Sequence, residues 1–294
     1  MRPQVILVAT LLLNFALFAF NLLVAIESGS RAVLSQAIFA ITDLVGSGLL
    51  IAGLYLSRQP ADYQYHFGRG KERFFWAFVS IVVTFTVAGV VALTAGVEQI
   101  VSPDKVSHIG QALAVVGASL LVSVASIYVT LRELRLGRET LEALLTSANQ
   151  GLKSIFYQDL VSIFGSVAAF VGLLAVYRTG DDAIDGVTAA ILGVFLVSTG
   201  FVLTAESREY LVGRALSPEE ARKIVALVEG DPRVARVREL QSMLLGPDDA
   251  LLALRVNFQN GLTTDQLESA IDQVSLALRT TYPILRHIVI EPES

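Results

Sequence analysis

Long apolar stretches separated by short polar loops dominate the first two thirds of the chain. A helix needs about 20 residues to cross a hydrocarbon layer of about 30 Å. Six stretches reach that length: Val5–Ile26, Ala32–Leu56, Phe74–Ile100, Ile109–Leu131, Leu152–Tyr177 and Ala183–Ala205. The pattern therefore predicts a bundle of six transmembrane α-helices over residues 1–213. The first stretch counts as a span because it is too long for the core of a signal peptide.

The loops between the stretches carry unequal positive charge. On one side the basic residues are Arg2, Arg58, Arg69, Lys71, Arg73, Arg132, Arg135, Arg138 and Lys153. On the other side they are Arg31, Lys105 and Arg178. Because basic residues concentrate in cytoplasmic loops, we expect both chain ends in the cytoplasm. The protein would be an integral, multi-pass protein of the lipid bilayer, and we expect the bacterial inner membrane.

The pattern changes to that of a small soluble domain over residues 214–294. Ser217–Glu229 and Thr263–Leu278 have the spacing of amphipathic helices, and Ser217 followed by Pro218 is a helix start signal. Strands are expected over Val234–Leu245, Ala250–Phe258 and Ile284–Ile290. The order α-β-β-α-β predicts two helices on one face of a three-stranded sheet, close to a ferredoxin-like α+β unit. At roughly 75 residues, such a domain would gain stability from pairing with a second copy.

Composition excludes several functional classes. Hydrophobic residues make up 53% of the chain and charged residues 17%, against about 25% charged in soluble domains. The net charge of −5 argues against nucleic-acid binding. The chain has no cysteine, so disulfides, thiolate metal sites and cysteine nucleophiles are excluded. Since no nucleophile–base arrangement or phosphate loop is visible, we expect neither an enzyme nor a resident cofactor.

Two aspartates, Asp43 and Asp159, stand near the middle of the second and fifth apolar stretches. An ionisable side chain at that depth is costly, and by default it marks a functional site. Two carboxylates that face each other repel, so the pair is suited to holding a cation or a proton. The alternative is that each aspartate bonds a neighbouring hydroxyl or backbone group and only fixes helix packing.

The linker between the second and third stretches contains a characteristic motif. It reads SRQPAD over Ser57–Asp62 and HFGRGKER over His66–Arg73. With the six spans and the α-β-β-α-β tail, this motif resembles the cation diffusion facilitator family of divalent-metal/proton antiporters. The runs Glu72–Ala77 and Leu245–Asp248 are similar to the zinc-transporter-nine-like branch of that family. The resemblance implies a homodimeric cation-efflux transporter that exchanges a divalent cation for protons.

The resemblance also implies a transport site between spans two and five, with two ligands per span one helical turn apart. Asp43 and Asp159 match the second ligand of each pair, and Gln158 is an auxiliary oxygen where the branch commonly has Glu. Phe39 and Ile155 stand where the family has the first ligands. Zinc favours four nitrogen, sulfur or oxygen ligands, whereas a partly hydrated, all-oxygen site suits Mg²⁺ or Mn²⁺ better. Further weak oxygens are offered by Thr42, Ser47 and Ser162.

The family's accessory metal sites are depleted in this chain. In the linker, Asp62 keeps a ligand position, while Tyr65 and Arg69 replace the family's histidines. In the tail, the histidine positions correspond to Arg238, Arg255 and Val289, and the acidic position to Glu291. These losses leave a second class of function open, a transport-inactive relative that acts as a scaffold or regulator. The survival of Asp43 and Asp159 favours transport, of zinc or of a harder cation such as Mg²⁺, Mn²⁺ or Fe²⁺.

Three further aspartates, Asp181, Asp182 and Asp185, lie at the start of the sixth stretch. They could attract cations or cap that helix. We expect capping from Asp181 and Asp182 and leave both roles open for Asp185.

Overall fold

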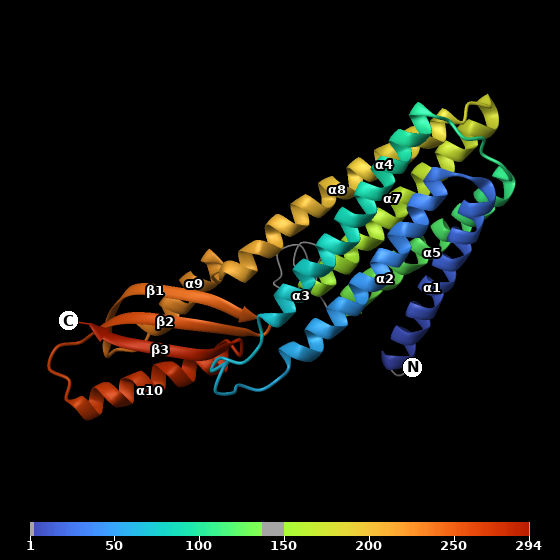
Figure 1. Cartoon of the computed structure of the whole chain (residues 1–294). Coiled ribbons are helices and arrows are strands. Elements are labelled where there is room, and N and C mark those ends of the chain that lie inside the picture. Colours follow the sequence, from blue (N-terminus) through green and yellow to red (C-terminus); the bar gives the residue numbers. More distant parts are fainter. Residues whose placement is uncertain (1–2, 137–149, 294) are drawn as a thin grey trace. The chain divides into compact units, whose positions relative to one another are not determined.

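The computed structural model describes residues 3–136 and 150–293. The chain divides into two compact units, one formed by residues 1–53 and 76–207 and the other by residues 54–75 and 208–294. The first unit is a bundle of helices, and the second contains a three-stranded sheet (Figure 1). Two of the basic residues used for orientation, Arg2 and Arg138, lie outside the described residues.

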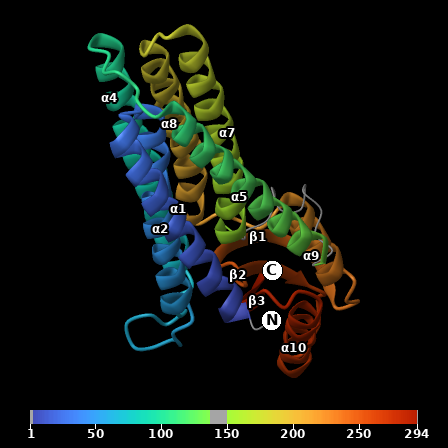
Figure 2. The same cartoon turned by 90° about the vertical axis from the view of Figure 1, so that its right-hand side faces the viewer.

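Each predicted apolar stretch forms a helix (Figures 1 and 2). The helices are α1 (Pro3–Ser28), α2 (Arg31–Ser57), α3 (Glu72–Ile81) with α4 (Ala88–Val101), α5 (Ile109–Leu136), α7 (Gln150–Thr179) and α8 (Ala183–Val212). Within the described chain, four are long and apolar enough to span a membrane: α2, the rod α3–α4, α7 from residue 159, and α8. The apolar segments found in α1 and α5 are shorter, over Phe18–Ser28 and Ile109–Ala125.

The third rod is not a regular α-helix. A π-helical segment, η1 (Val82–Val87), joins α3 to α4. Each π-turn adds a residue and shifts the side chains around the axis, and such segments are frequent at functional sites. Apolar spacing does not distinguish this segment from an α-helix, so the sequence did not predict it.

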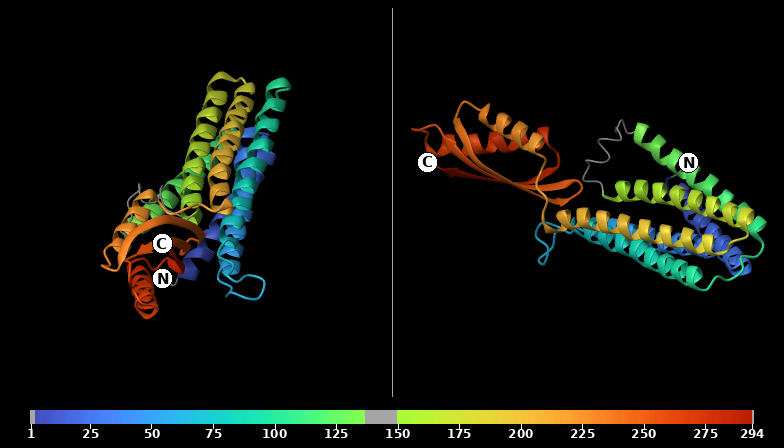
Figure 3. Two further views of the ribbon diagram at one scale, coloured as in Figure 1. Left: turned by 90° about the vertical axis from the view of Figure 1, so that its left-hand side faces the viewer. Right: turned by 90° about the horizontal axis from the view of Figure 1, so that it is seen from above.

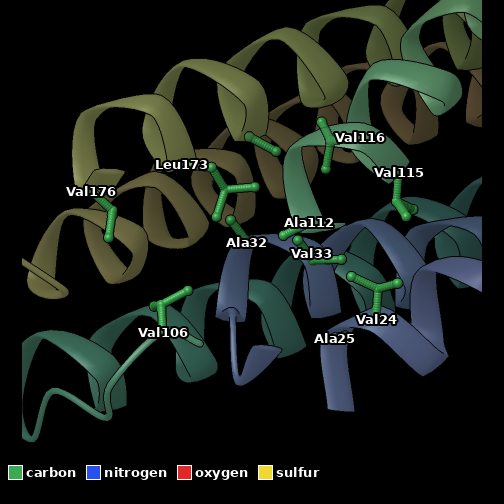
Figure 4. Close-up of a cluster of buried hydrophobic side chains, with 11 residues drawn as sticks. Val24, Ala25, Ala32, Val33, Val106, Ala112, Val115, Val116, Leu173 and Val176 are labelled. Carbon is green, nitrogen blue, oxygen red and sulfur yellow. The ribbon is translucent and has the colours of Figure 1, made fainter. Parts of the chain in front are cut away.

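One apolar cluster holds the ends of four helices together (Figure 4). Val24 of α1, Val33 of α2, Val116 of α5 and Leu173 of α7 are buried in it, together with Val106 from the segment before α5. The turn between α1 and α2 is fixed to the same segment, since Ser107 N–H donates to the Ser28 carbonyl at 2.6 Å. The cluster thereby fixes the start of α2, the helix that carries Asp43.

The tail confirms the predicted order of elements. It consists of α9 (Pro218–Glu229), β1 (Val234–Gly246), β2 (Asp249–Phe258), α10 (Thr264–Thr281) and β3 (Leu285–Glu293). Ser217 caps α9 as predicted, in a capping box with Glu220. The sheet order is β1-β2-β3, with β1 antiparallel and β3 parallel to β2. A parallel pair needs a crossover connection, and α10 supplies it.

Both tail helices pack on one face of the sheet (Figure 3). Alternate residues of β2 point toward them and are buried, as strand geometry requires. These are Ala250, Leu252, Leu254 and Val256, packed with Ile224, Val228, Ala270, Val274 and Leu278 of the helices. The opposite face carries Arg255, which forms ion pairs with Glu239 at 2.9 Å and Glu291 at 3.0 Å.

The linker after α2 belongs to the same unit as the tail. Phe67 stacks edge-on against His287 of β3, with ring centroids 5.0 Å apart. Lys71 Nζ lies 3.7 Å from Met243 Sδ of β1. At Gly70, an added Cβ would collide with the Leu245 carbonyl, so only glycine allows the two backbones to approach this closely. The linker is therefore held on the sheet by direct contacts.

Candidate cation site in the helix bundle

Asp43 and Asp159 belong to helices that touch. On the same two helices, Ser166 Oγ of α7 donates to Gln36 Oε1 of α2 at 3.5 Å. The carboxylates of Asp43 and Asp159 are near enough for their charges to act on one another. Asp159 is buried, and Asp43 Oδ1 is a buried oxygen with no hydrogen-bond partner in the part of the chain that the structure describes. Such an oxygen is costly unless a cation or a proton compensates it.

The position one turn before Asp43 contributes no ligand. Phe39 is buried there in an apolar cluster with Phe85 of η1, Val161 of α7 and Leu196 of α8. Its ring centroid is 6.2 Å from that of Phe85. A phenyl ring supplies no lone pair for a cation, so Phe39 closes one side of the site with hydrocarbon.

A cavity of about 20 Å³ lies between α2, α7 and α8. Its described lining residues are Ser35, Gln36, Phe39, Val161, Ser162, Gly165, Leu192, Phe195 and Leu196. A space of this size holds about one water molecule. Neither Asp43 nor Asp159 is among these residues, and the two carboxylates stand one turn away from Phe39 and Ser162 along their helices.

Reciprocal hydrogen bonds tie α2 to η1 beside the aspartates. Thr42 Oγ1 donates to the Thr84 carbonyl at 3.3 Å, and Thr84 Oγ1 donates to the Thr42 carbonyl at 3.2 Å. An added Cβ at Gly46 would collide with Thr84 Oγ1, so a small residue is needed for this approach. The π-helical segment therefore packs directly against the turn of α2 that carries Asp43.

The hydroxyls predicted as weak ligands are partly engaged. Thr42 Oγ1 also lies 2.9 Å from the Phe39 carbonyl, and Ser162 Oγ is 2.7 Å from Ser123 Oγ of α5. The Thr42 hydroxyl donates its proton in these bonds, while in the Ser162–Ser123 pair either hydroxyl can be the donor. The side chains of Gln158 and Ile155 lie outside the described residues, although both positions are on α7.

Two further buried polar atoms near the site were missed by sequence reasoning. Gln36 Nε2 of α2 and Ser80 Oγ of α3 have no hydrogen-bond partner within the described ranges. Gln36 precedes Asp43 by seven residues, or two helical turns, so both lie on the same face of α2. That spacing of polar residues in an apolar helix was the signal that could have identified Gln36.

Asp62 is held in the linker by local bonds. It accepts backbone N–H groups from Gln64 and Tyr65, both at 2.8 Å, and it pairs with Arg69 at 3.0 Å. The two backbone bonds and the Arg69 bond lower the pKa of Asp62. The Arg69 guanidinium also stacks over Tyr65, 4.3 Å from the ring centroid. A metal ion bound by Asp62 would have to compete with Arg69.

Among the described residues no group of three or more histidine, aspartate or glutamate side chains is close enough to hold a metal ion.

The three aspartates at the start of α8 serve different segments. Asp181 Oδ1 accepts the Ala183 N–H at 3.1 Å, which confirms its predicted capping role. Asp182 Oδ1 accepts the Val106 N–H at 3.0 Å, so its prediction as a cap of its own helix is wrong. Asp185 is fully buried and accepts the Ser30 hydroxyl at 2.7 Å together with the N–H groups of Arg31 and Ala32. It caps α2 from a distant part of the chain, and this role accounts for its burial.

Comparison with known proteins identifies similar transport proteins. Residues 7–212 match the family described as the cation efflux transmembrane domain. Among curated proteins, the chain is 24% identical over 250 residues to metal tolerance protein C4 of Arabidopsis thaliana. It is 24% identical over 299 residues to the mitochondrial proton-coupled zinc antiporter SLC30A9 of Homo sapiens. It is 25% identical over 277 residues to the cation-efflux pump FieF of Cronobacter sakazakii.

These matches differ in how much of each protein they include. The chain is covered over 83%, 97% and 94% of its length respectively. It spans about half the length of the first two relatives, 55% and 53%, and 86% of the third. The matched family region runs from within α1 to the end of α8.

Proposed function

This chain belongs to the cation efflux family and is an integral, multi-pass membrane protein, and on that premise we propose that it exports a divalent cation in exchange for protons. The family is one of transporters, which fits a protein that is not an enzyme. The names of two similar proteins, a proton-coupled zinc antiporter and a cation-efflux pump, support the proposal.

One observation carries the proposal. Asp43 and Asp159 lie on touching apolar helices, their charges act on each other, and Asp43 Oδ1 is buried without a hydrogen-bond partner among the described residues. A divalent cation between the carboxylates would offset their repulsion. When the cation leaves, a proton can take its place. Gln158, on the same turn of α7 as Asp159, is the proposed auxiliary oxygen ligand.

The predicted topology follows from the same family. We propose six spans with both ends in the cytoplasm, a ferredoxin-like tail that pairs in a homodimer, and a bacterial inner membrane as location. The arrangement of the tail supports the pairing, because both described tail helices lie on one face of the sheet and leave the other face available to a second copy. Asp62 remains a proposed linker ligand, and only in a state in which Arg69 has moved away.

The cation is proposed to be bound chiefly by oxygen. With Phe39 buried among Phe85, Val161 and Leu196, the first ligand of span two is absent. Zinc affinity should therefore be weak, and Mg²⁺ or Mn²⁺ are the better fit. Restoring Phe39→Asp together with Ile155→His should raise zinc affinity by more than tenfold, about 1.4 kcal/mol. Tight zinc binding by the parent, with no gain in the double variant, would contradict the assignment of ligand positions.

The decisive experiment is a flux assay in proteoliposomes. Zn²⁺, Mn²⁺, Fe²⁺, Co²⁺, Cd²⁺ and Mg²⁺ would each be offered to the parent protein, with a pH-sensitive dye inside the liposomes. The proposal expects uptake of at least one cation together with proton movement in the opposite direction.

A transport-inactive scaffold is the second candidate, and specific observations favour it. Asp62 is paired with Arg69, and Arg255, where the family has histidine, is paired with Glu239 and Glu291. A scaffold predicts no flux of any cation in the parent and no functional loss from Asp43→Asn.

A further inference from the structure

A cavity of about 540 Å³ lies within the second unit, and the proposed transport does not use it. Its walls come from the end of α2 and the linker, from the turn between β1 and β2, and from the start of β3. The volume falls in the range of sites that bind small molecules, about 300–1,000 Å³. It is therefore large enough for a ligand of several non-hydrogen atoms.

The cavity is lined by more positive than negative side chains. Four arginines line it, Arg58, Arg69, Arg73 and Arg286, against two aspartates, Asp248 and Asp249. Arg58 and Arg73 are near enough for their charges to repel each other. Asp249 Oδ2 lies 3.7 Å from His287 Nε2, whereas Asp249 Oδ1 is buried without a hydrogen-bond partner among the described residues. Like charges gathered in one cavity are unfavourable unless an anion joins them.

Two of the arginines form no ion pair among the described residues, although the charge of Arg286 acts on Asp249. Arg69 is paired with Asp62, and Asp248 is the opposite charge that acts on Arg73. In the described part of the chain, neither Arg58 nor Arg286 forms an ion pair, and both side chains are exposed. They approach the cavity from different segments, one at the end of α2 and the other at the start of β3.

The walls of the cavity are held in place before any ligand arrives. Arg69 is fixed by Asp62 and by stacking on Tyr65, and its Nε is a buried donor without a partner among the described residues. Phe67 stacks on His287, and Gly70 packs against Gly246. A preformed site loses less conformational freedom on binding.

We propose that this cavity binds a phosphate group, with Arg58 and Arg286 as its main ligands. The planar guanidinium matches phosphate oxygens in pairs, which makes arginine the preferred partner of this anion. Leu54 and Ser57, in the last turns of α2, also line the cavity. The cavity thus begins where an apolar span ends, which is where phospholipid headgroups lie, and basic pockets at that level bind anionic headgroups.

The enrichment of basic residues in cytoplasmic loops does not by itself explain the arginines that line this cavity. A surplus of basic residues near span ends accounts for Arg58, Arg69 and Arg73. It does not account for Arg286, which belongs to the tail sheet and follows α10. A phosphate bound by Arg58 and Arg286 would join the linker to β3. The phosphate can belong to an anionic phospholipid or to a soluble phosphate compound, and experiment separates the two.

The test uses the full-length protein in nanodiscs. In one arm the discs contain phosphatidylcholine with or without phosphatidylglycerol, and spin-labelled lipids of both kinds report which is retained at the protein. In the other arm the discs contain phosphatidylcholine alone, and calorimetry follows inorganic phosphate and glycerol 3-phosphate. R58Q/R286Q is compared with R222Q/R279Q, which removes two exposed arginines of α9 and α10 outside the cavity and changes the net charge equally.

The expected result is binding in at least one arm that falls at least tenfold in R58Q/R286Q and less than twofold in R222Q/R279Q. Retention of phosphatidylglycerol alone identifies a lipid, and binding in phosphatidylcholine discs identifies a soluble phosphate compound. R58K/R286K, which keeps charge but not the paired geometry, should bind with intermediate affinity. The proposal is overturned if the parent binds in neither arm, or if the two arginine-to-glutamine pairs lose binding equally.

Discussion

Asp185 and Asp43 both place a buried carboxylate oxygen in the helix bundle, and their surroundings differ. Asp185 accepts the Ser30 hydroxyl and the first N–H groups of α2, so its oxygens are used by the fold. Asp43 Oδ1 has no such partner among the described residues, and the charge of another carboxylate, Asp159, acts on Asp43. Burial alone therefore does not separate structural from functional aspartates. We propose that the state of their hydrogen bonds does.

The largest effect is expected from the aspartates of the proposed site. Asp43→Asn or Asp159→Asn should lower cation flux by at least about 100-fold. Substituting a residue that only hydrogen-bonds to a metal ligand already costs about 10- to 100-fold, and these substitutions would remove a ligand itself. Folding should be unaffected, because the substitution removes a repulsion. Flux in liposomes and the melting temperature in detergent measure the two properties. A variant that keeps parental flux would remove its aspartate from the site.

Asp185→Ala should give the opposite result. It leaves the Ser30 hydroxyl and the N–H of Ala32 buried without an acceptor, which costs about 2–4 kcal/mol. The melting temperature should fall, whereas the flux per folded molecule should stay close to that of the parent. If Asp185→Ala folds normally but loses flux, the comparison between the two aspartates fails.

A pair of glutamines extends the same comparison to uncharged side chains. Gln99 is fully buried and uses both ends of its amide, with Nε2 donating to the Asp104 carbonyl at 2.8 Å and Oε1 accepting the Asp104 N–H at 3.3 Å. Gln36 has an unpartnered Nε2 in the described structure. Gln36→Leu should lower flux several-fold without loss of stability, and Gln99→Leu should lower the melting temperature at unchanged flux. Parental flux in Gln36→Leu would show that the unpartnered Nε2 of Gln36 has no part in transport.

The smallest effect concerns a carboxylate outside the membrane. Asp231 is paired with Arg233 at 2.6 Å, and this bond lowers the pKa of Asp231. Because the pKa of Asp231 is lowered, the pair stabilises the folded tail at pH values above the pKa of an aspartate in the unfolded chain, about 3.9. That stabilisation is lost as the pH falls through the lower, folded value. The protection factors of the amides at the start of β1, which correct for the intrinsic effect of pH on exchange, should therefore fall in acid by on the order of twofold in the parent. Asp231→Asn should show no such step.

Much of the fold could be predicted from the sequence, because apolar length and turn residues determine it locally. The six helices cover the predicted stretches, and Ser217 begins α9 where its cap signal stands. The π-helical segment Val82–Val87 could not be predicted, since apolar spacing does not distinguish it from an α-helix and its contact with Thr42 exists only in the folded chain. The role of Asp185 was hidden for a similar reason. Its partners Ser30 and Ala32 lie more than 150 residues away along the chain.

The charged residues of the candidate site could be predicted from the sequence, whereas its uncharged polar residues could not. An aspartate in an apolar stretch is conspicuous, so Asp43 and Asp159 stand out at once. Gln36 and Ser80 are ordinary polar residues of membrane helices, and only the absence of a partner for their buried atoms draws attention to them. The cavity between the linker and β3 could likewise not be predicted, because Arg58 and Arg286 come to line it only in the folded structure.

Proton release on cation binding tests the central claim most directly. The purified protein would be titrated with Mn²⁺, Zn²⁺ or Mg²⁺ at neutral pH in weakly buffered detergent, and a pH-sensitive dye would count the protons set free. If Asp43 and Asp159 hold either a cation or a proton, the parent should release protons in proportion to bound cation. Asp43→Asn at the same concentration should release fewer or none, and Asp185→Asn should match the parent. Equal proton release by parent and Asp43→Asn, for every cation that binds, would contradict the account.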